Sequence, residues 1–501
     1  MSDPVYGIGI QQVGEGAQPA VVSDMSTVGL VGTAPNANPE VFPLNTPIVV
    51  FSDNTASLTA LGEEGTLYDA ILGINAQLGD YQSSARCVIV RIEAGANIDE
   101  TIANAVGSSV LKTGIHALPL SGPINGVIPR LIGVPGLTSQ QYSGLATLTL
   151  GTRGEKMTEA PTVVFSGGGS ASGKVLPTAH SVLGTGDDAD KVVSLVIDTV
   201  GRDLSGVLTV SFTGGGSDAD KVLPTATAAV EVLANPVVAA LPAVLSKLVA
   251  HAVVDGPATT VQAFTNWRET INSQRIIPLE TAVKASATAV KPGSSRILGI
   301  GVRRDHEYGG RPFHSWANQA VMGIVGPNRP IDFSLTDGAV EGQMILAQNG
   351  GVIVRGEMGV ESAVASGGFV YVGTDTCAED PLWTFYNVSR GRDYIHLLLL
   401  RTLRIFLGKR NIDVGTLEDV LNTVKFAMRD LEADKDILPG WQVGFRRDQN
   451  SPEQLRLGRF TIEFACEEPP VLRYIGIQSK RNRASLEILL DELMSSMDVA
   501  A

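Results

Sequence analysis

The chain has few cysteines, few aromatic residues and few charged residues for its length of 501 residues. Its three cysteines, Cys87, Cys377 and Cys466, lie far apart, which excludes a disulfide framework and a paired-cysteine metal site. Such sparse cysteine use favours synthesis in a reducing compartment. Charged residues make up 18% of the chain, below the roughly 25% of an average domain.

Positive charge is the scarcer sign, because 38 lysines and arginines face 52 aspartates and glutamates, for a net charge of −14. Nucleic-acid binding needs clustered lysine and arginine, so this balance excludes a generally basic binder of DNA or RNA. No uncharged apolar run reaches the roughly 18 residues of a membrane-spanning helix. The first residues also lack the basic and apolar segments of a signal peptide. We expect a protein without membrane insertion, made in a cytoplasm.

Catalytic motifs are missing as well. The chain has no nucleophile elbow, no phosphate-binding P-loop, no complete dinucleotide-binding glycine turn and no paired zinc histidines. The Asp187–Asp190 cluster lacks the glycine and glutamate of a calcium-binding loop, and a solvated turn is the simpler interpretation. Serine, histidine and aspartate all occur, so counting alone leaves a Ser–His–Asp triad open. We expect no enzyme activity, no cofactor and no metal.

What the chain does have is apolar residues, at 44%, and enough length for two to four domains. Short apolar segments at 28–32, 48–51 and 86–92 alternate with a helical repeat that runs from Leu67 to Leu78. This pattern predicts a mostly parallel sheet covered by helices. Further strands are expected at 117–120, 131–136, 275–279 and 296–301, and a proline-interrupted helix at 237–254.

An internal repeat interrupts this pattern between residues 141 and 235. The segment Val164–Ala179, with its Gly-Gly-Gly-Ser turn, recurs 47 residues later at Ser211–Ala226. Residues 191–200 between the two copies form another expected strand. Strands with glycine-rich turns at this spacing predict two copies of a small β unit. Because loops tolerate long insertions, we interpret 141–235 as an all-β domain inserted into an α/β protein.

The C-terminal part has the clearest helices. Thr416 is the expected cap of a helix whose apolar stripe runs from Leu417 to Leu431. Strands are expected at 459–465 and 472–478, followed by a last helix. One stripe of that helix would carry Leu486, Leu489, Leu490, Leu493, Met494 and Met497.

The densest positive charge in the chain lies just before these helices. This cluster is either a solvated helix face or a contact surface for an acidic protein neighbour. It consists of Arg401, Arg404, Lys409 and Arg410.

A set of short segments, in the same order along the chain, resembles the tail sheath proteins of contractile bacteriophages. Each segment is weakly specific alone, but the ordered set covers about 400 residues and leaves out the insertion. The segments are Thr27–Pro35, Thr46–Asp53, Val88–Ile92, Arg311–Asn318, Ile324–Gly326, Asn349–Ile353, Trp383–Arg390, Gly458–Ile462, Pro469–Pro470 and Ile475–Ile477. The insertion itself is similar to glycine-rich β repeats of phage structural proteins.

The resemblance implies a multi-domain α/β (α+β) protein with a subtilisin-like three-layer core that lacks a working protease triad. Its expected parts are an N-terminal arm (1–24), an N-terminal α/β region (25–110), the core domain (111–140 and 236–395), the inserted β domain (141–235) and a C-terminal α+β domain with its arm (396–501).

The resemblance also implies a structural subunit of the virion tail, assembled in the cytoplasm of a host bacterium. Copies would form hexameric rings that stack helically around a tail tube protein and meet baseplate and tail terminator proteins, with no nucleic acid bound directly. Terminal arms would donate strands to neighbouring copies. The candidate strand residues are Val5, Tyr6, Ile8, Ile10, Val13, Leu472, Tyr474, Ile475 and Ile477, and the candidate hinges are Gly7, Gly9, Gly14 and Gly16.

Physical chemistry supports such links, because a strand added to an exposed sheet edge gains main-chain hydrogen bonds that depend little on side chains. Three alternatives stay open at this stage. They are the sheath of a contractile injection system that is not a phage, a subtilisin-like hydrolase, and a monomeric carbohydrate- or receptor-binding protein built on the β repeats.

Overall fold

The computed structural model describes residues 24–79, 82–171 and 173–498. The chain divides into two units, Met1–Pro469 and Pro470–Ala501, and each is described by itself. All the candidate strand and hinge residues of the N-terminal arm, from Val5 to Gly16, lie outside the described residues. In the described ranges no helix has both the length and the apolar character needed to cross a membrane.

A six-stranded sheet organises the first unit, and five of its strands are parallel, as predicted. The sixth, β2, pairs antiparallel with β3 at one edge. The sheet contains strands both from the predicted N-terminal region and from the predicted core domain. Its order is β12 (Ile276–Leu279), β11 (His251–Asp255), β4 (Leu131–Gly133), β1 (Val28–Thr33), β3 (Arg86–Ile92) and β2 (Pro47–Phe51).

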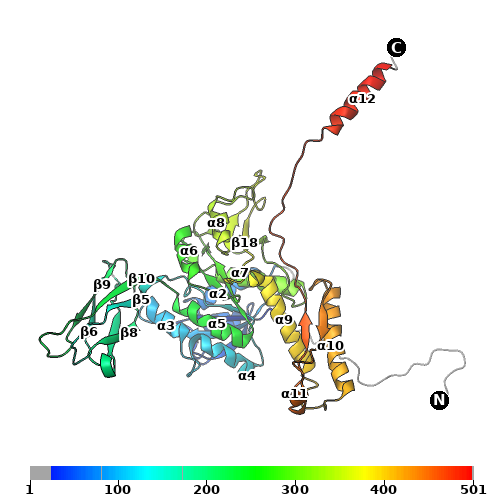
Figure 1. Cartoon of the computed structure of the whole chain (residues 1–501). Coiled ribbons are helices and arrows are strands. Elements are labelled where there is room, and N and C mark those ends of the chain that lie inside the picture. The colour runs from blue at the N-terminus through cyan, green and yellow to red at the C-terminus, as the bar shows by residue number, and fades with distance from the viewer. Residues whose placement is uncertain (1–23, 80–81, 172, 499–501) are drawn as a thin grey trace. The chain divides into compact units, whose positions relative to one another are not determined.

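Helices cover both faces of this sheet (Figure 1). Side chains alternate along a strand, so Val88 and Val90 enter one apolar core while Cys87 and Ile89 enter the other. Both faces are therefore buried, which explains the nearly continuous apolar runs of these strands. The first core contains α3 (Ile98–Val106), α5 (Pro236–Leu248) and α6 (Val261–Glu269), and the second contains α1 (Thr55–Leu61), α2 (Leu67–Asn75) and α7 (Ser294–Glu307).

Three predicted elements of this region are wrong. Residues 296–301 form part of α7, because a helix buried on most of its surface shows the same unbroken apolar run as a buried strand. Residues 117–120 belong to the 3-10 helix η1 (Gly114–Leu120), which leads into α4 (Ser121–Asn125). The predicted helix at 237–254 stops at Leu248, and Val249 turns into β11 with a positive φ of 48°.

Small sheets and short helices follow α7. One sheet consists of β14 (Val290–Lys291), β13 (Val283–Lys284) and β16 (Gly326–Pro327). The other consists of β15 (Gln319–Ala320), β18 (Phe369–Val372) and β17 (Val352–Arg355). The helices are α8 (Glu341–Ala347) and η3 (Pro381–Trp383).

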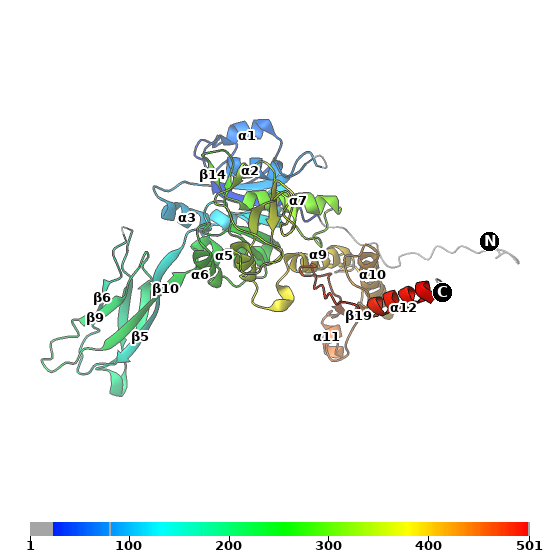
Figure 2. The same cartoon turned by 90° about the horizontal axis from the view of Figure 1, so that it is seen from above.

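The inserted segment is all β apart from the short helix η2 (Gly186–Asp188). Strands β5 (Tyr142–Thr152) and β10 (Thr225–Leu233) form an antiparallel ribbon that leads to four more strands (Figure 2). These four make one sheet in the order β8 (Val192–Thr199), β7 (Thr178–Leu183), β6 (Thr162–Gly167) and β9 (Leu208–Thr213).

The 47-residue repeat appears in the structure as an approximate twofold axis. Val164 of β6 faces Ser211 of β9 as its Cα partner, and these two residues are equivalent positions of the two copies. The hydroxyls of Thr178 and Thr199 lie 2.8 Å apart, and those of Thr225 and Thr152, 47 residues later and earlier, lie 2.9 Å apart. Each copy therefore supplies a strand that completes the other copy.

The glycine triplets of the repeat occupy positions that other residues cannot take. Gly167–Gly169 and Gly214–Gly216 all have φ between 75° and 94°, a left-handed conformation that favours glycine. A Cβ atom at Gly169 would lie 2.0 Å from Ser205 Oγ, and one at Gly216 would lie 1.8 Å from Thr158 Oγ1. The triplets thus serve backbone geometry and close packing.

The end of the first unit is a small α+β layer with its own apolar core. Helices α9 (Tyr386–Leu403) and α10 (Val414–Ala433) pack together and against a two-stranded sheet of β19 (Gln442–Gly444) and β20 (Glu463–Ala465). Asp413, not Thr416, caps α10, because its carboxylate accepts the Thr416 N–H at 2.7 Å. The strand predicted at 459–465 is shorter than expected, and α11 (Pro452–Arg456) precedes it.

The second unit consists of an extended segment and one helix. The strand predicted at 472–478 is absent. Residues 471–482 have no regular secondary structure in the single chain. The predicted last helix is confirmed as α12 (Ala484–Asp498).

Candidate assembly surfaces

Ser389 and Asp393 of α9 meet His251 of β11 in the order of a Ser–His–Asp triad. His251 Nε2 lies 2.9 Å from Ser389 Oγ, and His251 Nδ1 lies 3.7 Å from Asp393 Oδ2. The three residues are only 0%, 3% and 5% exposed, in the order His251, Ser389, Asp393. A nucleophile has to reach its substrate, so this buried group does not form a hydrolase site.

The hydrogen bonds around His251 show a structural role instead. The Ser389 hydroxyl donates to the carbonyl of Gln274 at 3.1 Å, which leaves its oxygen free to accept from His251. Arg275 donates to both carboxylate oxygens of Asp393. Burial, reinforced by the positive charges of Arg275 and Arg390, holds the pKa of His251 well below its usual value. His251 is therefore a neutral group that joins α9 to the sheet.

The part of the chain that the structure describes contains neither a metal-binding cluster nor a reactive thiol among Cys87 and Cys377. There, no three His, Cys, Asp or Glu side chains are grouped to hold a metal ion. In the Asp187–Asp190 turn, Asp188 pairs with Arg153 at 3.2 Å and with Lys191 at 3.4 Å. Burial raises the pKa of Cys87 and of Cys377 to about 12, so neither thiol is reactive.

The predicted basic cluster forms the turn between α9 and α10, which we name the basic corner (residues 400–414). Arg404, Lys409 and Arg410 are exposed and Arg401 is half-buried. The N–H groups of Lys409 and Arg410 both donate to the Phe406 carbonyl at 3.3 Å, which keeps the turn compact.

Sequence reasoning missed the apolar half of this corner. Large apolar side chains are exposed among the cations, and Leu407 and Val414 are 76% and 74% exposed. The sequence could have indicated these residues, because they fall outside the apolar stripes of α9 and α10. The exposed apolar residues of the corner are Leu400, Ile405, Leu407, Ile412 and Val414.

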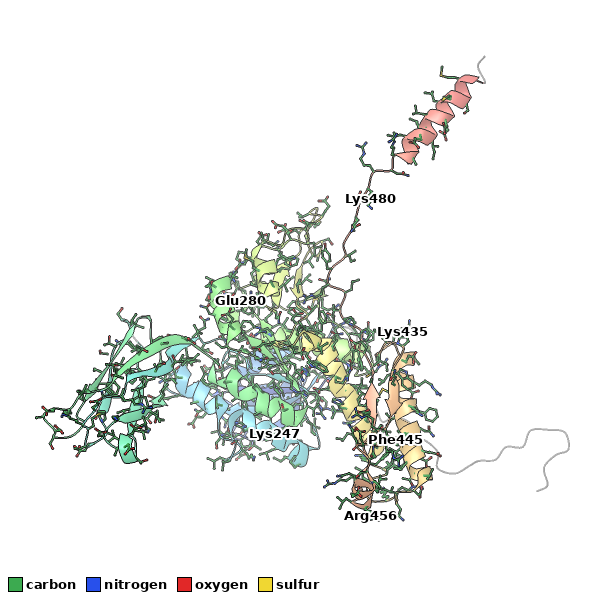
Figure 3. The ribbon with its side chains drawn as sticks, in the orientation of Figure 1. Lys247, Glu280, Lys435, Phe445, Arg456 and Lys480 are labelled. Carbon is green, nitrogen blue, oxygen red and sulfur yellow. The ribbon has the colours of Figure 1, made fainter. Side chains whose placement is uncertain are left out.

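A second basic surface, which the sequence did not single out, surrounds α11. Arg446, Arg447, Arg456 and Arg459 are exposed there, and Figure 3 labels Phe445 and Arg456 in this region. Arg446 pairs with Asp448 at 2.7 Å, so part of this charge is neutralised within the chain. The four arginines are too far apart in sequence to form a visible run.

The sheet of β19 and β20 is incomplete. It contains two strands of three residues each, and no third strand joins it in the described ranges. Val443 and Phe464 attach one face of the sheet to the core formed with α10. Two-stranded sheets are marginally stable, and their outer edges present unpaired N–H and C=O groups. This sheet is therefore suited to accept further strands.

The candidate strand residues of the C-terminal segment are exposed in the single chain. Leu472, Tyr474, Ile475 and Ile477 are between 71% and 88% exposed. Side chains of this kind are normally buried in soluble proteins, and a contiguous exposed set marks an interaction site. These four apolar side chains are therefore not covered by other residues of their own unit.

No family model matches the chain. Among solved structures, the chain is similar to the sheath complex of the PVC extracellular contractile injection system in its contracted state. The TM-score is 0.56 at 11% identity, covering 97% of this chain and 99% of that one. It is also similar to a chain of the anti-feeding prophage baseplate (TM-score 0.53, 12% identity, 96% and 100% coverage). These likenesses establish the fold as the mixed α/β fold of sheath proteins.

Curated relatives carry the same description. The chain is 21% identical over 499 residues to the tail sheath protein of Escherichia phage P2, covering 96% of both chains. It is 26% identical over 241 residues to a putative prophage major tail sheath protein of Pseudomonas aeruginosa strain UCBPP-PA14, covering 47% of this chain and 58% of that one. The major tail sheath protein of Serratia phage KSP20 matches at 30% over 126 residues, 24% of this chain and 30% of that one.

These relatives are described as sheath proteins. The chain is therefore similar over nearly its whole length to a phage tail sheath protein, and it has the fold of the sheaths of contractile injection systems.

Proposed function

We propose that copies of this sheath subunit link through exchanged strands, stack as hexameric rings around a tail tube, and contract to drive the tube through a host envelope. The observation that carries the proposal is a complementary pair of incomplete features. One is the exposed apolar segment from Leu472 to Ile477, and the other is the two-stranded sheet β19–β20 with its open edges. A segment of one copy that pairs on the edge of another copy would complete both.

The sheet offers two edges and the chain offers two arms. The C-terminal segment would occupy one edge, and residues Val5–Val13 of the N-terminal arm would occupy the other in a different neighbour. Main-chain hydrogen bonds persist while the domain bodies rotate about hinges, for which Gly7, Gly9, Gly14 and Gly16 are the candidates. The extended sheath is then a metastable packing that contracts by burying more surface, without a nucleotide.

Further parts of the proposal follow from the similarity to sheath proteins. The six-stranded sheet with helices on both faces would correspond to the subtilisin-like domain, and the domain limits given above remain a prediction. The tail tube, baseplate and terminator proteins are the proposed neighbours. The inserted β domain would lie on the outside of the sheath, where it leaves packing around the tube unobstructed.

Truncation tests this proposal. A chain lacking residues 1–20 and a chain lacking residues 470–501 should each remain folded monomers, measured by light scattering and circular dichroism, and form no sheath. Truncated chains that still polymerise into contractile tubes would contradict strand exchange. Capsid and terminase genes beside this gene would favour a phage over another contractile injection system.

A further inference from the structure

Helix α12 carries an apolar stripe that has no cover in its own unit. The six stripe residues from Leu486 to Met497 are between 54% and 66% exposed. An isolated helix of 15 residues is marginal in water, and most helices are stabilised by packing their apolar face. The helix therefore needs an apolar surface to rest on.

Carboxylates border this stripe. Glu487 and Asp491 are four residues apart, so they lie along one side of the stripe, and Glu492 lies along the other. The surface that covers the stripe must then be apolar with basic groups at its margins. The whole chain has a net charge of −14, so basic groups are the scarcer kind on which such a helix could dock.

The basic corner has the required composition. It presents Arg404, Lys409 and Arg410 together with exposed Leu407 and Val414. The corner thus combines the densest cations of the chain with an apolar surface of its own. Its charge is opposite to that of the carboxylates that border the stripe of α12.

We propose that α12 of one copy docks on the basic corner of a second copy, apolar stripe against apolar patch, with carboxylates facing the cations. This inference rests on the proposed strand exchange, which brings residues 472–478 to the β19–β20 sheet of the same second copy. It identifies the acidic neighbour of the basic corner as another copy of this chain.

The lengths of the segments allow this contact. Five residues, 479–483, separate the exchanged segment from α12 and can span about 17 Å when extended. The helix adds about 22 Å, at about 1.5 Å per residue. On the receiving copy, Trp441 beside β19 hydrogen-bonds Glu432 at 2.6 Å, near the end of α10. The basic corner begins at the other end of that helix, about 27 Å away at the same rise per residue.

A charge-swap experiment tests the docking. Two double variants are assembled separately and compared with wild-type protein: Arg404→Glu/Lys409→Glu and Glu487→Lys/Asp491→Lys. The amount of polymer is measured by sedimentation and electron microscopy. Each double should raise the critical concentration about tenfold. The chain with all four substitutions should return to the wild-type value. Unchanged critical concentrations for the doubles, or no recovery in the combined chain, would overturn the inference.

A control double uses exposed cations outside residues 400–414. Arg153→Glu/Lys247→Glu changes the net charge by the same amount and should leave assembly unchanged; Figure 3 labels Lys247 on α5. An equal loss of assembly in this control would contradict a specific contact. If the corner double and the α12 double both assemble as wild type, only the docking fails. If wild type forms no sheath, the proposed function itself fails.

Cross-linking identifies which copy receives the helix. With Cys466→Ser removing the half-buried thiol, the exposed positions Asn411 and Ser485 are changed to cysteine and the sheath is oxidised. A ladder of dimers and higher species on a non-reducing gel is the expected result. A cross-linked monomer, or no cross-link, would overturn docking between copies.

Discussion

The guanidinium of Arg390 and the carboxylate of Asp305 form a fully buried, two-pronged ion pair, with Nη1–Oδ1 at 3.0 Å and Nη2–Oδ2 at 2.5 Å. Asp305 belongs to α7 on the central sheet, and Arg390 belongs to α9, which continues into the C-terminal layer. The Arg390 guanidinium also lies 4.9 Å from the ring centre of Trp316. The pair therefore ties α9, which leads into the candidate assembly surfaces, to the α/β body.

Breaking this pair should destabilise the subunit. Arg390→Met leaves the Asp305 carboxylate buried without its partner, which should lower the free energy of unfolding by about 3–5 kcal/mol. Chemical denaturation of the monomer measures the change. The double variant Asp305→Leu/Arg390→Met removes both charges and should be less unstable than the single variant. A single variant as stable as wild type would contradict the anchoring role of the pair.

The buried His251 predicts a loss of stability in acid. Its pKa is well below the usual value in the folded chain, so below about pH 6.5 the unfolded chain binds a proton that the folded chain excludes. The contribution of neutral His251 to the free energy of unfolding is therefore fully present above about pH 6.5. It falls by about 1.4 kcal/mol for each pH unit below that value.

The variant His251→Gln isolates this effect, because an amide can still donate to Ser389 but does not titrate. Thermal melting of both proteins between pH 7.5 and 5 gives the comparison. The melting temperature of wild type should fall more steeply with acid than that of the variant, whatever other groups titrate. Parallel pH profiles would show that His251 becomes charged in the folded chain.

The inserted β domain should be removable. Tyr142 and Leu233 are Cα partners at the base of the β5–β10 ribbon, so a two-residue Asn-Gly turn can join them in place of residues 143–232. The shortened chain should fold and form sheaths of normal length by negative-stain microscopy. A folded chain that fails to assemble would contradict an exterior position for the domain. Tyr142→Phe, which removes the 3.1 Å hydrogen bond to Asp99, controls for damage at the base.

Charges placed in the C-terminal segment should block assembly without unfolding the subunit. Ile475→Asp and Ile477→Asp alter side chains that are 71% and 88% exposed in the single chain. Melting temperatures should therefore stay the same, while polymer yield falls by at least about tenfold, because an exchanged strand would have to bury these charges. Ser479→Asp is the matched control outside the candidate strand and should assemble normally.

The strands of the central sheet could be predicted because each is a short apolar run between turns. β1, β3 and β12 lie where the residues place them, and α2 follows its helical spacing. The 47-residue repeat correctly predicted β strands between residues 141 and 235. Their approximate twofold axis depends on which strands pair, and no local sequence pattern shows that. The failure at 296–301 has a plain cause, since α7 is buried on most of its surface and loses the periodicity that distinguishes a helix.

The candidate assembly surfaces were predictable only in part. The cluster of Arg401, Arg404, Lys409 and Arg410 is visible in the sequence as a group of cations. The exposure of its apolar neighbours becomes apparent only from the packing of α9 and α10. The segment 472–478 has the residue pattern of a strand and has no strand structure in the single chain. The reason is physical, because a strand needs a partner strand for its backbone hydrogen bonds, and no strand of the described residues is paired with this segment.

Helical reconstruction of the assembled sheath by electron microscopy tests the central claim most directly. The result we expect is a sheet in which β19 and β20 of one copy are flanked by residues 472–478 of a second copy. Polymers in which the sheet keeps two strands, or in which residues 472–478 pair within their own chain, would contradict it.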